Sequence, residues 1–232
     1  MLKLVVYPAL FGEPSASPFC VKAMGLLKLA GLSYSIEATD DPRKAPKAKL
    51  PVLQDSGAVI ADSDQIRDHI EKTLGLDFDE GLDPAQQAVS RAVIRMMEEH
   101  LYFAIVCDRW INDDNWAHVK RTFFTGIPVP LKGLVTNYVR KQARAQLHGQ
   151  GMGRHNKDER FERVRKDISA IVTLLGEKPF LFGDKPSAAD ISVVAMLRAA
   201  MVAPVATDLS SFIAGNATLT RYLDRGREAI YP

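Results

Sequence analysis

The sequence has only two cysteines, Cys20 and Cys107, in 232 residues. They have no metal-ligand spacing, and two scattered cysteines make no disulfide framework, so we expect no bound metal and a reducing, cytoplasmic setting. No run of about 18 apolar residues occurs, so the sequence predicts no membrane span. The residues 2–7 are too short for a signal-peptide core and read as a buried strand.

Strong net charge is also missing. The 30 basic and 28 acidic residues leave a formal charge of +2, which excludes a general binder of polyanions. A basic run in the first half consists of Arg43, Lys44, Lys47 and Lys49. It has no interleaved aromatic side chains for stacking on bases, so we expect no nucleic-acid partner.

The first 76 residues alternate strand and helix patterns. Pro18 suits the first position of a helix over 18–30, and Ser17 suits its N-cap, where the hydroxyl would accept from a free backbone N–H. Alternating residues predict a strand over 34–38, and two apolar runs at 50–53 and 58–61 flank a hairpin turn. A helix over 63–74 completes an α/β domain, which we place at 1–76.

The second part, 84–232, has helical patterns throughout. Asp83 and Pro84 start a long helix, and the residues 126–130 (GIPVP) interrupt helical structure. Further helices are predicted over 131–147, 160–175 and 187–201. Ser187 and Asp190 have the spacing of a capping box. We therefore expect an all-α domain after a boundary near 75–84.

Motifs in both parts, taken in order, carry a family resemblance. The first part contains Ser17-Pro18-Phe19-Cys20, then Lys49-Leu50-Pro51, then Asp62-Ser63. The second contains the stretches 98–102 (EEHLY), 153–155 (GRH) and 180–186 (FLFGDKP). The chain resembles the glutathione S-transferases, in the branch of the failed-axon-connections and metaxin-like proteins. The resemblance implies a thioredoxin-like domain followed by an all-helical domain, with glutathione as cosubstrate and no metal.

The resemblance places Ser17 at the catalytic position. A helix start favours a thiolate over a thiol, and a serine hydroxyl there can donate a hydrogen bond to it. Lowering a thiol pKa from ~8.5 by about two units takes roughly 2.7 kcal/mol, which is within reach of these two effects. Tyr7, at the end of the first strand, is an alternative donor. Cys20 is an alternative reactive thiol, although its position three residues after a serine prevents dithiol cycling and favours a small buried residue.

The other motifs imply a glutathione site. Pro51 resembles the cis-proline of the thioredoxin fold, with Leu50 offering its backbone to the cysteinyl part of glutathione. Lys49 suits the glycyl carboxylate, and Asp62 and Ser63 suit the γ-glutamyl group. Helix capping explains Asp62 and Ser63 about as well, and a trans proline at a strand start is the common alternative for Pro51.

The acceptor side has weaker indications. Tyr102, Arg109 and Trp110 can share one helix face toward the first domain, where they would line a pocket for a hydrophobic electrophile, but helix packing explains them equally well. Arg154 and His155 match the family without a chemical role. The function expected is glutathione conjugation, in detoxification, by a homodimer by analogy with the family. A non-catalytic binding or scaffold protein, and a glutathione-dependent peroxidase or thiol transferase using Cys20, stay as alternatives.

Overall fold

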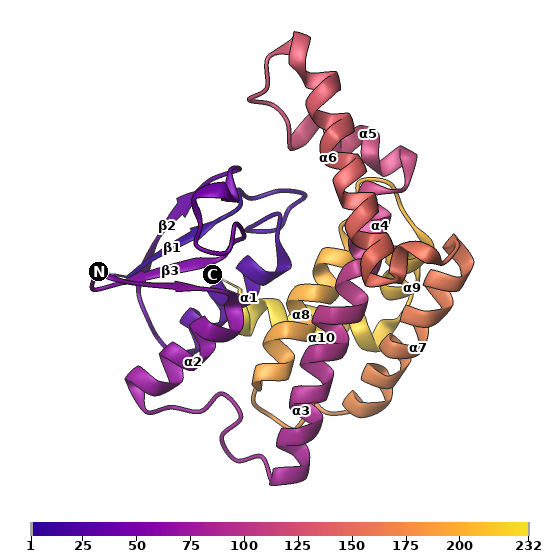
Figure 1. Ribbon diagram of the computed structural model, residues 1–232. Helices are drawn as coiled ribbons and strands as arrows, with labels where there is room; N and C mark the ends of the chain where they lie inside the picture. Colours follow the sequence, from indigo (N-terminus) through magenta and orange to yellow (C-terminus); the bar gives the residue numbers. More distant parts are fainter. Residues whose placement is uncertain (1, 232) are drawn as a thin grey trace.

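The computed structural model describes residues 2–231 and shows a sheet-containing part followed by a helical part (Figure 1). The first part contains β1 (Leu2–Val6), α1 (Pro18–Leu29), β2 (Tyr34–Ala38), the 3-10 turn η1 (Pro42–Lys44), β3 (Val52–Asp55), β4 (Ala58–Ala61) and α2 (Ser63–Leu74). The sheet order is β2-β1-β3-β4, with β1 parallel to β2 and the other pairs antiparallel. This mixed sheet confirms the predicted thioredoxin-like fold.

The second part is all helical, as predicted. It contains α3 (Pro84–Met96), the π-helix η2 (Met97–Leu101), α4 (Tyr102–Trp110), α5 (Asp113–Thr122), α6 (Val129–Gln150), the 3-10 turn η3 (Met152–Arg154), α7 (Lys157–Leu175), α8 (Ala188–Met201), α9 (Asp208–Ala214) and α10 (Ala217–Ile230). Among the described residues, no helix is long and apolar enough to cross a membrane.

Helix α8 lies at the centre of the molecule. Its residues from Ala188 to Ala200 are all buried, and it packs against α1 of the first part and α3, α9 and α10 of the second. The capping box predicted from Ser187 and Asp190 is present, and the Asp190 carboxylate also accepts from the backbone N–H of Leu181 and the hydroxyl of Tyr222. Burial raises the pKa of Asp190, and these donors, together with the Ser187 hydroxyl at 2.6 Å, offset part of that effect. The capping motif therefore fixes the helix against which both parts pack.

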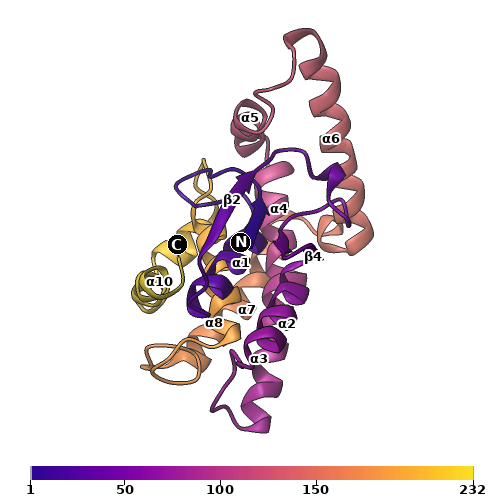
Figure 2. The ribbon, with the colours of Figure 1, turned by 90° about the vertical axis from the view of Figure 1, so that its left-hand side faces the viewer.

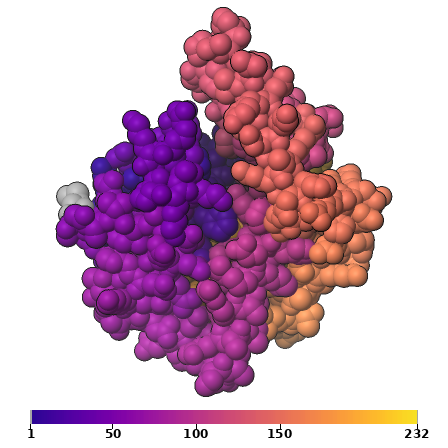
Figure 3. Space-filling model, viewed as in Figure 1, coloured from indigo at the N-terminus to yellow at the C-terminus, as the bar shows by residue number. Residues whose placement is uncertain are grey.

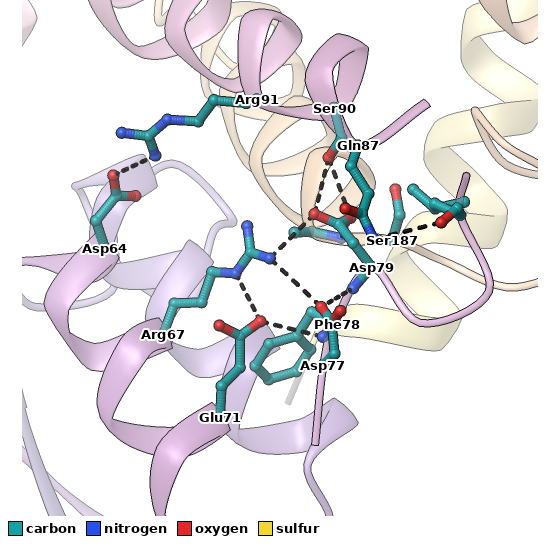
Figure 4. Close-up of polar contacts among 12 residues, drawn as sticks. Asp64, Arg67, Glu71, Asp77, Phe78, Asp79, Gln87, Ser90, Arg91 and Ser187 are labelled. Atoms are coloured by element: carbon teal, nitrogen blue, oxygen red, sulfur yellow. Dashed lines mark hydrogen bonds and ion pairs between the residues drawn. The ribbon is translucent and has the colours of Figure 1, made fainter. Parts of the chain in front are cut away.

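The connection between the two parts is held by a buried carboxylate. Asp79 accepts from the Ser90 hydroxyl of α3 at 3.0 Å, from the backbone N–H of Ala188 at 3.2 Å and from the Arg67 guanidinium of α2 at 3.0 Å (Figure 4). Arg67 also pairs with Glu71 at 2.8 Å, which in turn accepts from the backbone N–H of Phe78. The connecting segment is thus tied to α2, α3 and the start of α8.

Helices α5 and α6 form an arm that extends beyond the rest of the molecule in both ribbon views (Figures 1 and 2). Its base is fastened by Arg140, which donates to the backbone carbonyls of Trp110 and Ile111 and pairs with Asp113 at 2.6 Å. The same guanidinium lies 5.1 Å from the ring centre of Trp116. The base of the arm is therefore part of the helical core.

Candidate functional site

The site is built where β1 ends and α1 begins. Ser17 occupies the N-cap position of α1 and Pro18 its first turn, as predicted. The Ser17 hydroxyl, however, makes no capping hydrogen bond, so the expectation that it would accept from a backbone N–H is wrong. The backbone N–H of Ser17 is directed to the Ser15 hydroxyl at 3.3 Å, and that hydroxyl donates to the Tyr7 carbonyl at 2.7 Å. The half-buried Ser17 hydroxyl thus caps nothing in its own helix.

The loop before Ser17 is held by residues from the helical part. The Arg109 guanidinium donates to the carbonyl of Ala16 at 2.9 Å and to the carbonyl of Ala199 at 2.7 Å. Further along the loop, buried Glu13 accepts two hydrogen bonds from Arg198, at 3.0 and 2.7 Å, and one from the Tyr231 hydroxyl at 2.5 Å. These contacts fix the loop that delivers Ser17.

The peptide bond between Leu50 and Pro51 is cis, as the resemblance implied. Val5 lies opposite Val52 in the β1–β3 register, so continuing the register by one residue places Pro51 beside Val6. The cis-proline therefore lies at the end of the sheet where β1 leads toward Ser17. Its carbonyl accepts from the backbone N–H of Asp62 at 3.3 Å, which brings the start of α2 to the same end.

Asp62 and Ser63 begin α2 together. The Asp62 side chain is exposed and accepts from the backbone N–H of Asp64 at 2.9 Å, so it does cap the helix. Its backbone has a φ of 95°, an unusual conformation for a residue with a side chain. Ser63 is buried, with an exposed fraction of 3%. Lys49, one residue before the cis bond, is exposed.

Tyr7 and Cys20 lie close to Ser17 and differ in what they can do. Burial raises the pKa of Tyr7 to about 12, with Cys20 and Tyr102 adding to the effect, so its phenol keeps its proton at neutral pH. Cys20 is fully buried, and burial raises the pKa of its thiol despite hydrogen bonds from the Tyr7 backbone and the Ser15 and Ser17 side chains. A buried thiol with a raised pKa lacks the thiolate character and access of a reactive cysteine.

The structure gives different surroundings to the three residues expected on the acceptor side. The Tyr102 ring meets Phe19 of α1 edge-on, with ring centres 4.8 Å apart, and its hydroxyl makes no hydrogen bond within residues 2–231. Arg109 is buried, and two of its nitrogens are engaged by backbone carbonyls, which makes it a residue that positions the loop. Trp110 packs at the base of the arm against Trp116, 5.6 Å away between ring centres. Tyr102 is therefore the member that borders Ser17's helix.

A hollow in the molecular surface lies between the first part and α6, with atoms of the indigo N-terminal segment at its floor (Figure 3). The walls of the hollow therefore come from both parts of the chain. Within residues 2–231, no group of three or more His, Cys, Asp and Glu side chains is arranged to hold a metal ion.

An ion network that the sequence interpretation missed lies behind the site. Lys22 of α1 is buried, with an exposed fraction of 1%, and pairs with Asp64 and Glu98 at 2.6 Å each. The Glu98 carboxylate also accepts from the Ser192 hydroxyl of α8 and from Arg95 of α3. The sequence feature that could have revealed this pair is the single lysine in the otherwise apolar stretch from Val21 to Leu27, because a buried charge needs a partner.

The Arg154 and His155 motif proves to close a turn. Arg154 donates to the carbonyl of His148 at 2.8 Å, and the His155 carbonyl accepts from Arg160 at 2.6 Å. At Gly153 a Cβ atom would stand 2.8 Å from the backbone of Leu147, so no larger residue fits there. The motif joins α6 to α7 and has no contact with the site.

Two family models match the chain: the glutathione S-transferase N-terminal domain over residues 18–116 and the glutathione S-transferase C-terminal domain over residues 164–226. The isoprene-epoxide–glutathione S-transferase of a Rhodococcus strain is 30% identical, over 98% of both chains. Failed axon connections of Drosophila melanogaster is 31% identical over 79% of this chain but only 46% of its own length. Mouse metaxin-1 is 25% identical over 84% of this chain and 64% of its own.

Solved structures share the fold. A glutathione transferase of Phanerochaete chrysosporium has a TM-score of 0.67 at 18% identity, over 100% of this chain and 98% of the other. A glutathione S-transferase of Ceriporiopsis subvermispora in complex with glutathione has a TM-score of 0.67 at 17% identity, over 98% and 97%. Together with the two family models and the full-length relative, they lead to one conclusion. The chain belongs to the glutathione S-transferase family.

Proposed function

We propose that the protein is an enzyme that conjugates glutathione to a hydrophobic electrophile. The observation that carries the proposal is the Ser17 hydroxyl at the start of α1, which makes no capping hydrogen bond in its own helix, at the end of the sheet that presents the cis Leu50-Pro51 bond. A hydroxyl that caps its own helix is directed to backbone N–H groups, whereas this one, which interacts with the Cys20 side chain, can donate its O–H to a ligand. The similarity to a glutathione transferase over almost the whole chain supports the same proposal.

Glutathione would lie along this end of the sheet, with its cysteinyl backbone paired to Leu50. Its γ-glutamyl α-carboxylate would meet the Ser63 hydroxyl and the backbone N–H groups that open α2, its α-ammonium would meet Asp62, and its glycyl carboxylate would meet Lys49. The exposed positions of Lys49 and Asp62 suit ligand charges that remain partly in water. This arrangement directs the glutathione sulfur toward Ser17.

Ser17 would then donate its O–H to the glutathione thiolate, and the positive end of α1 would add to the stabilisation. The thiolate attacks an electrophilic carbon, a sulfur–carbon bond forms, and the bond to the leaving group breaks with its electron pair. Where the electrophile is an epoxide, as the name of the Rhodococcus relative suggests, the opened ring oxygen needs a proton. The Tyr102 hydroxyl, which borders α1 and is not engaged by the protein, is the donor we propose.

Two alternative functions receive less support. A thiol transferase would need an accessible, ionisable thiol, and the Cys20 side chain is fully buried with a raised pKa. A non-catalytic scaffold is suggested by the similarity to failed axon connections and the metaxins, but it gives no reason for a serine at the start of α1 that does not cap the helix. We propose a cytoplasmic homodimer with a role in detoxification as the setting of the conjugation activity.

Titration calorimetry with glutathione, followed by conjugation assays on a panel of epoxides, tests the proposal. We expect binding, and we expect Ser17→Ala to reduce turnover about 10- to 100-fold, the equivalent of one charge-assisted hydrogen bond, with binding largely kept. Tyr7→Phe is the matched control and should leave turnover within a few-fold. If glutathione does not bind, or if Tyr7→Phe rather than Ser17→Ala removes turnover, the proposal fails.

A further inference from the structure

The α5–α6 arm has an unusual distribution of charge. Residues 113–150 contain six basic side chains and two acidic ones, Asp113 and Asp114 in the first turn of α5, which leaves 24 basic and 26 acidic residues in the rest of the chain. The near-neutral total therefore hides a basic arm on a body that is net acidic. Of the six, Arg140 is paired with Asp113. The other five make no ion pair within residues 2–231: Lys120, Arg121, Lys132, Lys141 and Arg144.

The same arm exposes large apolar side chains. Val129, Leu131, Leu134 and Tyr138 have exposed fractions of 86%, 52%, 73% and 62%. Leu131, Leu134 and Tyr138 follow the spacing of one helix face, and Thr136 and Leu147, on the opposite face of α6, are buried toward the molecule. Lys141 and Arg144 continue along the exposed side of the helix. The outward face of α6 thus combines an apolar stripe with unpaired cations.

The position of the arm suggests that it has a role other than completing the core of the protein. It projects beyond both parts of the molecule (Figure 2), and residues 117–163 fall between the two family-model matches. Its base is anchored through Arg140 and Trp116, and the Phe123 ring after α5 lies 6.4 Å from the Phe11 ring of the first part, measured between ring centres. An exposed apolar patch surrounded by polar residues is typical of a docking surface.

We propose that this arm docks the protein onto the surface of a lipid bilayer that contains anionic lipid. Apolar side chains on one face of a helix, with lysines and arginines beside them, are what an interfacial helix uses to enter the headgroup region. A second copy of the chain fits less well, because its arm carries the same positive charge and the rest of the chain is only slightly acidic. A nucleic acid fits less well because aliphatic side chains, which dominate the stripe, offer no surface for stacking on bases.

Co-sedimentation of the full chain with vesicles tests the proposal, using phosphatidylcholine alone and phosphatidylcholine with roughly a quarter phosphatidylglycerol. We expect binding only to the anionic vesicles, weakened by salt. Each cation near such a surface contributes about fivefold, so the triple variant Lys132→Gln, Lys141→Gln, Arg144→Gln should lower the partition coefficient about a hundredfold. The variant Leu131→Gln, Leu134→Gln, Tyr138→Gln should lower it about tenfold or more with all charges kept.

The matched control replaces three exposed, unpaired lysines of the body, Lys72→Gln, Lys166→Gln and Lys185→Gln, and should leave vesicle binding within a few-fold. Unchanged glutathione affinity in every variant shows that the fold is kept. The proposal is overturned if anionic vesicles do not bind, or if the control loses as much binding as the charge variant. It is also overturned if the apolar variant converts a dimer to a monomer in sedimentation velocity, or if the arm retains duplex DNA and not vesicles.

Discussion

Arg109 shows how a buried charge can serve a site without touching the ligand. Its guanidinium joins the loop residue Ala16 to Ala199 of α8, and Ala16 directly precedes Ser17. Two backbone carbonyls would be left without donors if this side chain were removed. Buried carbonyls that lose their partners are costly, so the residue contributes to stability and to the placement of Ser17 together.

We expect Arg109→Met to lower the free energy of unfolding by about 2–4 kcal/mol, and to reduce turnover more than glutathione affinity, since the loop before Ser17 is released. Arg109→Lys should recover part of both, because one ammonium can still reach a carbonyl. Urea unfolding and steady-state kinetics measure the two effects. The exposed Arg43→Met is the control and should change neither. A variant with full turnover would show that Arg109 does not position the site.

Single residues were predictable where a motif requires a particular chemistry. The cis bond before Pro51 and the capping box of Ser187 and Asp190 follow from local motifs, and both are present. The role of Arg109 could not be predicted, because its partners are backbone carbonyls 93 and 90 residues away. For Ser17 the position was predictable, but the lack of a capping hydrogen bond from its hydroxyl was not, because it depends on the loop geometry around Ser15.

At the scale of elements, the ion network joins helices that packing alone would leave free to slide. Asp64 of α2 accepts from Lys22 of α1 and from Arg91 and Arg95 of α3. Burial alone would raise the pKa of Asp64, but Lys22 and the two arginines outweigh it and lower the pKa to about 2. The ionised form of Asp64 is therefore stabilised more in the folded protein than in the unfolded chain.

The sign of the pH dependence follows from that lowered value. A pKa near 2 in the fold, against 3.8 when unperturbed, gives stability that is complete above the unfolded value and is lost as the pH falls through the folded one. The shift corresponds to about 2 kcal/mol at neutral pH. We expect Asp64→Asn to lose about this much, with the gap to the wild type narrowing as the pH falls from about 5 to about 3. A gap that stays constant over that range in urea unfolding would contradict the network.

The helical rod from Pro84 to Trp110 is an element that the sequence predicted only in part. Its start at Asp83 and Pro84 was correct, but the π-helical turn from Met97 to Leu101 was not foreseen. The turn contains Glu98, whose partners Lys22 and Ser192 are distant in the sequence. Helices α9 and α10 were covered only by the general helical pattern of the second part.

At the scale of the whole molecule, the two parts meet so closely that glycine is needed at the contact. A Cβ atom on Gly25 of α1 would lie 2.3 Å from the Cγ2 atom of Ile230 and 3.0 Å from that of Ile191. Lys28 of the same helix donates to the carbonyl of Glu228 at 2.9 Å. The end of α10 is thus pressed against α1, so the last helix of the chain stabilises the first.

Gly25→Ala should therefore destabilise the protein, although alanine is the better helix former by about 1 kcal/mol. The overlap with Ile230 forces side chains from their places, which typically costs about 1–3 kcal/mol, so a net loss of unfolding free energy is expected. Gly133→Ala in α6 is the matched control, because its Cβ would meet nothing within 4 Å and should stabilise the chain slightly. If both substitutions stabilise the protein in thermal unfolding, the contact between α1 and α10 is looser than the structure shows.

Much of the whole-molecule arrangement could be predicted from the sequence through its ordered motifs, which indicated the two-part fold. The projection of the α5–α6 arm could not, because it depends on where a segment with few internal contacts leaves the core. Its charge was visible in the sequence as the absence of Asp and Glu over residues 115–150. Only the structure shows that the unpaired cations and the apolar side chains share one exposed helix.

The pKa of the glutathione thiol, measured in the complex by the ultraviolet absorbance of the thiolate, tests most directly whether Ser17 stabilises that thiolate. We predict a bound thiol pKa about two units below the free value of ~8.5, and a rise of about one to two units in Ser17→Ala, since one charge-assisted hydrogen bond is lost. Glutathione affinity should change little at a pH low enough to protonate the bound thiol. A bound thiol pKa that is the same in the wild type and in Ser17→Ala would contradict the account.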